Sequence, residues 1–86
     1  MKIIFSLHAL RRMEERFISK SLTIIALDGP DVLEQSTEDK KKFLAKKMYF
    51  NKQLRKKHLL MVIYRQAGKT IKIITIIDTS KVKKYF

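Results

Sequence analysis

Hydrophobic residues near the start of the chain recur with the period of an α-helix. Between residues 7 and 17 they occupy every third or fourth position and share one predicted helix face: Leu7, Leu10, Met13 and Phe17. Ser6 stands immediately before this stretch, and serine is a preferred N-cap because its hydroxyl accepts a hydrogen bond from a free backbone N–H. The pattern predicts a helix from Leu7 to about Arg16.

A second helix is predicted directly after the first. Ser19 suits the N-cap position, and the helix is expected to run to about Leu27. Its buried face is predicted to consist of Leu22, Ile25 and Ala26. The stretch Asp28–Gly29–Pro30 then ends the helix, because glycine suits the C′ position and proline cannot continue a helix. We expect the two short helices to form one corner.

Beyond residue 31 the hydrophobic period changes to two, which is typical of β-strands. Four strands are predicted, at residues 31–36, 43–53, 58–66 and 70–78, separated by turns at 37–42, 54–57 and 67–69. The third strand is almost entirely apolar, which predicts a central place in the sheet. The sequence therefore predicts an α+β fold in one domain of residues 1–86, with two N-terminal helices packed on one face of an antiparallel sheet of about four strands.

Positive charge is the strongest global property of the chain. Twenty Lys and Arg residues against eight Asp and Glu residues give a net charge of +12. This favours a polyanionic partner: nucleic acid, an acidic protein segment or an anionic membrane surface. The chain has no cysteine, which excludes disulfides and thiolate sites. No apolar run approaches the ~20 residues of a spanning helix, and residues 1–10 do not resemble a secretory signal, so we expect a cytoplasmic protein without membrane association.

The predicted first helix carries one of the two histidines among several charged residues. His8 and Arg12 are four residues apart, so their side chains project from neighbouring turns of one flank. A functional interpretation makes His8 a general acid or base, with Arg12 or Arg16 on a phosphate. A structural interpretation packs His8 on the sheet and pairs Glu15 with Arg11 or Arg12. Three arginines and two glutamates on one helix favour such an ion-pair network.

Clusters of basic residues provide further candidates, because they can follow a phosphate backbone. The candidate nucleic-acid-binding residues are Lys52, Arg55, Lys56, Lys57, Arg65, Lys83 and Lys84. Lys81 and Tyr85 follow the end of the last strand, where loops often carry functional sites, and they join the catalytic candidates. The basic turn at 52–58 can equally be a solvated hairpin tip.

The spacing of residues indicates neither a nucleophile–His–acid arrangement nor a metal site. His8 and His58 lie in different predicted elements, and no cysteine or paired carboxylate completes a set of ligands. We therefore expect no metal and no cofactor.

Three stretches, HALRRMEERFIS, DGPDVL and IKIITIIDTSKVKKYF, together resemble a widespread family of small uncharacterised prokaryotic proteins. The positions that fit its pattern are His8, Ala9, Arg12, Met13, Glu15, Arg16, Ile18, Ser19, Pro30, Asp31 and Thr75. The element order and the ending are also similar to the BrnT-type toxins of the RelE/ParE group. Two positions depart from the resemblance. Phe17 stands where glycine is usual and would be strained at a positive φ, and Ile77 replaces an aromatic residue that often follows the last-strand threonine.

The resemblance implies a compact α+β endoribonuclease that needs no metal and is held inactive by a companion antitoxin. RNA would then be the partner, and the catalytic candidates would be His8, Arg12, Arg16, Lys81 and Tyr85. Two alternatives stay open. One is a non-catalytic basic module that binds nucleic acid or an acidic protein, and the other is a homodimer assembled through an exposed sheet edge.

Overall fold

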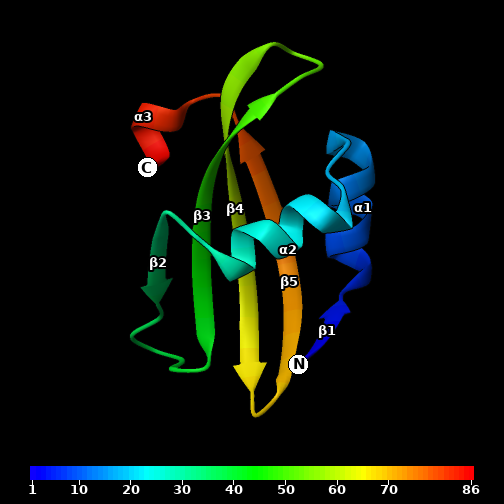
Figure 1. The fold of residues 1–86 in the computed structure, drawn as a ribbon. Helices are drawn as coiled ribbons and strands as arrows, with labels where there is room; N and C mark the ends of the chain where they lie inside the picture. Colours follow the sequence, from blue (N-terminus) through cyan, green and yellow to red (C-terminus); the bar gives the residue numbers. More distant parts are fainter.

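A mixed sheet of five strands forms the centre of the molecule (Figure 1). The computed structural model describes every residue from Met1 to Phe86. Its elements are β1 (Lys2–Phe5), α1 (Leu7–Arg16), α2 (Lys20–Asp28), β2 (Val32–Gln35), β3 (Lys42–Asn51), β4 (Lys56–Ala67), β5 (Thr70–Thr79) and α3 (Val82–Tyr85). The strand order is β1-β5-β4-β3-β2, and every neighbouring pair is antiparallel except β1 with β5, which is parallel.

The predicted α+β class is confirmed, and the four predicted strands correspond to β2, β3, β4 and β5. The prediction of a purely antiparallel sheet is wrong, because β1 adds a fifth strand in parallel with β5. β1 is only four residues long, and it pairs Lys2 with Thr70 far along the chain. Neither a local turn nor a clear period therefore indicates it. The short helix α3 was not predicted either.

Ser6 begins α1 and also attaches it to the sheet. Its Oγ accepts a hydrogen bond from the Ala9 N–H at 3.0 Å, which confirms the predicted N-cap. The same hydroxyl donates to the Ile74 carbonyl at 2.8 Å, and the Ser6 N–H donates to the Ile73 carbonyl at 3.0 Å. The last two bonds hold the start of α1 against β5, beside which the helix lies (Figure 1).

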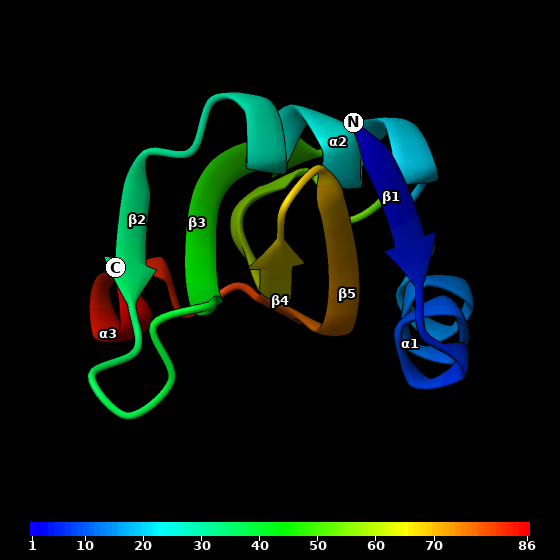
Figure 2. The same cartoon turned by 90° about the horizontal axis from the view of Figure 1, so that it is seen from below.

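The buried face of α1 differs from the predicted one. Ala9 and Met13 are buried, whereas Leu7 is 82% exposed and Phe17 is 77% exposed. Because α1 lies at the margin of the sheet beside β5 rather than across it, a narrow stripe of small or flexible side chains is enough to pack it (Figure 2).

The second helix, α2, lies across the sheet over β3 and β4 (Figure 1). Ser19 caps it as predicted, since its Oγ accepts from the Leu22 N–H at 3.0 Å. Of the residues predicted to be buried, Ala26 is buried, Leu22 is half-buried and Ile25 is exposed. Thr23 is fully buried instead, and its hydroxyl donates to the Ser19 carbonyl at 3.1 Å, so this polar residue is satisfied within its own helix.

Left-handed backbone, which glycine usually supplies after a helix, is found at Phe17 and not at Gly29. Phe17 has φ 56°, whereas Gly29 has φ −139°. The Ile18 N–H donates to the Met13 carbonyl at 2.8 Å, and the Phe17 N–H donates to the Glu14 carbonyl at 3.4 Å. This pair of bonds is the Schellman motif, which requires the left-handed residue.

A β-bulge in β5 decides which of its side chains share a face. The pairing of β4 with β5 shifts register between Ile63 and Tyr64, which leaves Ile74 as an extra residue. Side chains normally alternate along a strand, so residues five apart point to opposite faces. The bulge reverses this alternation, and Ile73 and Asp78 therefore face the same side of the sheet.

The two faces of the sheet are covered differently. Beneath α1 and α2 lies the core, which includes Leu60 and Val62 from β4 and Ile73 and Ile76 from β5. The alternate residues of β4 point to the opposite face, on which α3 packs (Figure 2). None of the helices is long and apolar enough to cross a membrane.

Candidate active site

Three polar side chains meet at the end of the sheet where β3 and β5 finish and β4 begins. They are Tyr49, His58 and Asp78, and we call them the His58–Asp78–Tyr49 cluster. His58 Nδ1 lies 2.9 Å from Asp78 Oδ2, and the Tyr49 hydroxyl donates to Asp78 Oδ1 at 2.7 Å. The side chains of His58 and Asp78 are only 6% and 5% exposed. Both oxygens of a buried carboxylate are thus hydrogen-bonded.

Strand register and the bulge together assemble this cluster. Tyr49 and His58 are direct partners across β3 and β4, and their rings stand 6.0 Å apart at 62°. Asp78 reaches the same face only because the extra residue precedes it on β5. Asn51 supports the cluster from the hairpin turn, since its Nδ2 donates to the Tyr49 hydroxyl at 3.4 Å and its Oδ1 accepts from the Leu54 N–H at 3.0 Å.

The hydrogen bonds assign the protons within the cluster. An ionised Asp78 can only accept, so the network places a proton on His58 Nδ1. The neutral imidazole then keeps a lone pair on Nε2, which is the form required of a general base. Burial, with a smaller effect from the hydrogen bond to Asp78, raises the pKa of Tyr49 above its ordinary value of 10.0. The Tyr49 hydroxyl therefore retains its proton and acts as a donor.

His58 Nε2 is a buried side-chain nitrogen with no hydrogen-bond partner. Two adjoining hollows, with volumes of about 400 and 210 Å³, are lined by His58, and we call them together the His58 cleft. The residues that line both hollows are Arg16, Leu54, His58 and Asp78. Leaving a buried polar atom unpaired costs free energy, so a ligand that forms a hydrogen bond with Nε2 would remove this cost.

The His58 cleft contains both basic and acidic residues, because Glu15 and Asp78 line it as well as Arg16 and Lys56. Arg16 lines both hollows and Lys56 lines the larger one. The ion pairs of the molecule are Lys46–Glu34, Lys47–Asp31, His58–Asp78 and Arg65–Asp39. The predicted ion-pair network on α1 is therefore wrong, since Glu15 pairs with neither Arg11 nor Arg12. Exposed pairs on a helix contribute little free energy, so nothing forces them to form.

Of the catalytic candidates predicted from sequence, Arg16 lies in the His58 cleft. His8 is exposed near the start of α1, about 12 Å along the helix from Arg16, so the interpretation that packs His8 on the sheet is wrong. Arg12 is also exposed. Lys81 lines a neighbouring hollow and Tyr85 is exposed on α3. The structure does not bring His8 and Tyr85 together in one of the hollows described here.

The predicted nucleic-acid-binding residues fall into three groups. Lys56 lines the His58 cleft, and a hollow of about 470 Å³ adjoins this cleft at Ser80. We call this hollow of about 470 Å³ the lysine hollow, because its lining includes Lys57, Lys81, Lys83 and Lys84. Lys52 lines another hollow, and Arg55 lies in the β3–β4 turn. Arg65 stands at the far end of β4, seven residues from His58, and is therefore remote from the cleft.

The two central residues of the site, His58 and Asp78, were not recognised in the sequence. Their separation of twenty residues matches no short motif, and His58 was grouped with the basic turn before it. One signal was available, because the two residues are equally distant from Gly68, the turn of the predicted hairpin. That symmetry places them at the same end of the sheet, but it does not reveal the bulge that turns them to the same face.

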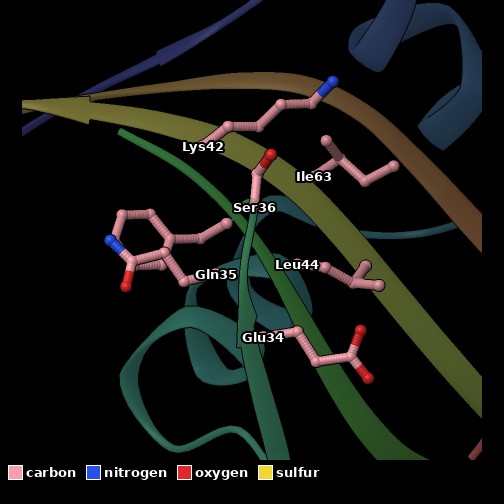
Figure 3. Close-up of a pocket in the computed structure, with 7 residues that line it drawn as sticks. Glu34, Gln35, Ser36, Lys42, Leu44 and Ile63 are labelled. Atoms are coloured by element: carbon pink, nitrogen blue, oxygen red, sulfur yellow. The ribbon is translucent and has the colours of Figure 1, made fainter. Parts of the chain in front are cut away.

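Another hollow, of about 170 Å³, lies between β2 and β3 near the opposite end of the sheet. Figure 3 shows that the polar ends of Glu34, Gln35 and Lys42 point away from one another there. It therefore lacks the convergent polar groups of a reactive site. No group of three or more His, Cys, Asp or Glu side chains is placed to hold a metal ion.

Comparison with known proteins gives one result. A protein-family model described as a domain of unknown function, DUF4258, matches residues 5–83. No curated protein and no solved structure matches the chain. The resemblance to BrnT-type toxins, the antitoxin partner and the homodimer stay predictions.

Proposed function

We propose that this chain, which belongs to the DUF4258 family, binds RNA and cleaves its backbone with His58 as the general base. The observation that carries the proposal is the unpaired His58 Nε2 in a cleft lined by Arg16 and Lys56, with Nδ1 held by a buried carboxylate. A carboxylate that orients an imidazole and stabilises its protonated form is a recurrent arrangement in acid–base catalysis.

The reaction we propose is transesterification within the RNA. His58 Nε2 removes the proton of a 2′-hydroxyl, and the resulting oxygen attacks the adjacent phosphorus. The bond from phosphorus to the 5′ oxygen breaks, which leaves a 2′,3′-cyclic phosphate and a 5′-hydroxyl. Water in the open cleft protonates the leaving oxygen, and His58 returns its proton to water.

Arg16 and Lys56 supply the charge that this chemistry requires. The phosphate gains negative charge in the transition state, and cations positioned beforehand stabilise it. Asp78 stabilises the imidazolium that forms on His58. The Tyr49 hydroxyl in turn fixes the orientation of Asp78, to which it donates at 2.7 Å. In this scheme Tyr49 and Asp78 are positioning residues, and His58 touches the reacting atom.

One observation favours the alternative of a non-catalytic RNA-binding module. His58 Nε2 has less than 1 Å² of accessible surface, so neighbouring side chains must move before a substrate oxygen can reach it. Leu54 is exposed, belongs to the hairpin turn and lines both hollows, which makes it the side chain best able to move. Without such movement, Arg16, Lys56 and the lysines of the lysine hollow would bind a phosphate backbone and leave it intact.

The experiment compares the two histidines of the chain. Purified protein is incubated with a mixed RNA pool in the presence of EDTA, and the ends of the products are mapped. His58→Asn is expected to slow cleavage by about a hundredfold or more, as loss of a general base does. His8→Ala is expected to cleave at the wild-type rate, whereas the sequence-based assignment expects the opposite result.

A second measurement distinguishes the proposal from its alternative. Cleavage at wild-type rate by His58→Asn contradicts the role of His58. RNA binding that weakens steeply with salt, in a wild-type protein that leaves the RNA intact, supports the non-catalytic module. If cleavage is found, arrested growth on inducible expression, relieved by His58→Asn, would extend the proposal to a toxin.

A further inference from the structure

An aromatic groove adjoins the His58 cleft. It has a volume of about 470 Å³, and its lining residues include the exposed Phe17 and Phe50. The aromatic groove and the smaller hollow of the His58 cleft share Phe17, Asn51 and Gln53. The lysine hollow shares one lining residue, Ser80, with the larger hollow of the cleft.

Phe17 has a conformation and an exposure that packing does not explain. Its φ of 56° lies in the left-handed region, where a non-glycine residue is strained, and its side chain is 77% exposed. The residues on either side that close the helix end, Met13 and Ile18, are buried and do the packing. The Schellman motif needs left-handed backbone at this position but not a phenylalanine, which is strained there where glycine would not be, so the exposed ring of Phe17 requires a role outside the core.

We propose that this groove holds one unpaired base of single-stranded RNA, stacked on Phe17 or Phe50, while the neighbouring phosphate lies at His58. The inference rests on the proposed RNA-binding function and specifies its substrate. Every nucleobase has a flat face that stacks on an aromatic ring, and such stacking is the usual way in which proteins hold single strands.

The arrangement of charge favours RNA as the occupant over an apolar peptide. An apolar peptide would use only the aromatic groove, whereas a nucleic acid strand would also use the cations around it. The lysine hollow and the His58 cleft offer cations to the backbone, and Lys52 stands at the aromatic groove itself. The net charge of +12 acts in the same direction.

The geometry also selects unpaired RNA. In an A-form duplex the bases are stacked on one another and their faces are unavailable, so a base must leave the helix to meet Phe17 or Phe50. Asn51 already bonds Tyr49 and the Leu54 backbone, which leaves the exposed Gln53 as the amide free to contact a base edge. With one such contact, we expect the groove to accept all four bases with only a modest preference.

The test uses Phe17→Gly, because glycine relieves the left-handed strain and removes the ring at the same time. The probe is a single-stranded RNA with one 2-aminopurine and with 2′-O-methyl groups, so that it binds without being cleaved. Wild-type protein is expected to change the fluorescence of 2-aminopurine on binding, as stacking does. Phe17→Gly is expected to abolish this change and weaken binding about tenfold.

Two controls separate a lost contact from a damaged fold. The thermal midpoint of Phe17→Gly should equal or exceed that of the wild type, since glycine is the preferred residue at this position. Leu7→Ala, which removes an exposed apolar side chain at the other end of α1, should bind the probe normally. Phe50→Ser provides a second ring deletion and is expected to weaken binding of the same probe.

The outcomes distinguish this inference from the proposed function. The base site is overturned if the wild type and both ring variants bind the single strand with equal affinity. It is also overturned if the wild type binds single strand and duplex with equal affinity. Either result counts against the base site even if the enzyme cleaves RNA. A fluorescence change in the wild type that both ring variants lose, with no cleavage of unmodified RNA, supports the base site and contradicts the catalytic proposal. Absence of RNA binding, with capture of an acidic peptide, overturns both.

Discussion

Replacing Asp78 with alanine is expected to be among the most destabilising single changes in this protein. Asp78 accepts from His58 Nδ1 at 2.9 Å and from the Tyr49 hydroxyl at 2.7 Å. Alanine leaves both donors unpaired in a buried place, and each orphaned group costs about 1–3 kcal/mol. We expect the free energy of unfolding to fall by about 4 kcal/mol, since two donors are orphaned at about 2 kcal/mol each.

Two companion variants test the reasoning behind this magnitude. Asp78→Asn keeps the size of the side chain and one acceptor, so it should cost about 1.5–3 kcal/mol, the value of one lost hydrogen bond to a charged group. In Asp78→Ala with Tyr49→Phe, one orphaned donor is absent. The double variant should therefore be about as stable as Asp78→Ala or slightly more stable, although Tyr49→Phe alone is destabilising.

The assay is urea and thermal unfolding followed by far-ultraviolet circular dichroism, because the chain has no tryptophan. For a domain of this size, about 1 kcal/mol shifts the thermal midpoint by roughly 4–8 °C, so Asp78→Ala should lower it by about 16 °C or more. A midpoint within a few degrees of the wild type would refute the buried cluster. If the loss in free energy of unfolding of the double variant equals the sum of the losses of the two single variants, the direct bond between Tyr49 and Asp78 is refuted.

Two further predictions concern other parts of the fold. The pKa of Asp39 lies below its ordinary value of 3.8, chiefly because Arg65 donates a hydrogen bond to it at 2.7 Å. Folding therefore favours ionised Asp39. The contribution of Asp39 to the free energy of unfolding is fully present above about pH 4, and it is lost as the pH falls through the lower pKa of the folded state. The thermal midpoint of Arg65→Gln should thus fall less steeply below pH 4 than that of the wild type. An unchanged dependence of the thermal midpoint on pH would contradict the ion pair between Arg65 and Asp39. Ser6→Ala removes the N-cap and the side-chain bond to Ile74, so we expect the free energy of unfolding in urea to fall by about 1–2 kcal/mol. An unchanged free energy of unfolding would show that the two hydrogen bonds of the Ser6 hydroxyl do not stabilise the fold.

Sequence reasoning succeeded where the deciding interactions are local. Both helix starts were predicted because Ser6 and Ser19 bond a backbone N–H three residues on, within the reach of one turn. The β4–β5 hairpin was predicted from its short glycine-containing turn, which brings adjacent strands together without any long-range information. These features depend on neighbours within a few positions, so a period or a cap residue is enough to identify them.

The errors share a different cause. Leu7 and Phe17 were expected to be buried because helical periodicity marks an apolar stripe, but it does not tell how far a helix overlaps the sheet. The Schellman motif at Phe17 contradicts the rule that glycine ends helices, and only the exposed ring suggests why another residue stands there. The sequence makes His8 a candidate because charged residues surround it, whereas His58 begins an apolar strand and is not a candidate.

What the sequence by itself determined is the order of α1, α2 and the strands β2 to β5, the N-caps Ser6 and Ser19, and the net positive charge of the chain. The tertiary structure alone decided the parallel pairing of β1 with β5, the extra residue at Ile74 and the meeting of His58 with Asp78. The physical reason is the alternation of side chains along a strand. One additional residue turns every later side chain to the other face, so the partner of His58 depends on a register shift that no local pattern records.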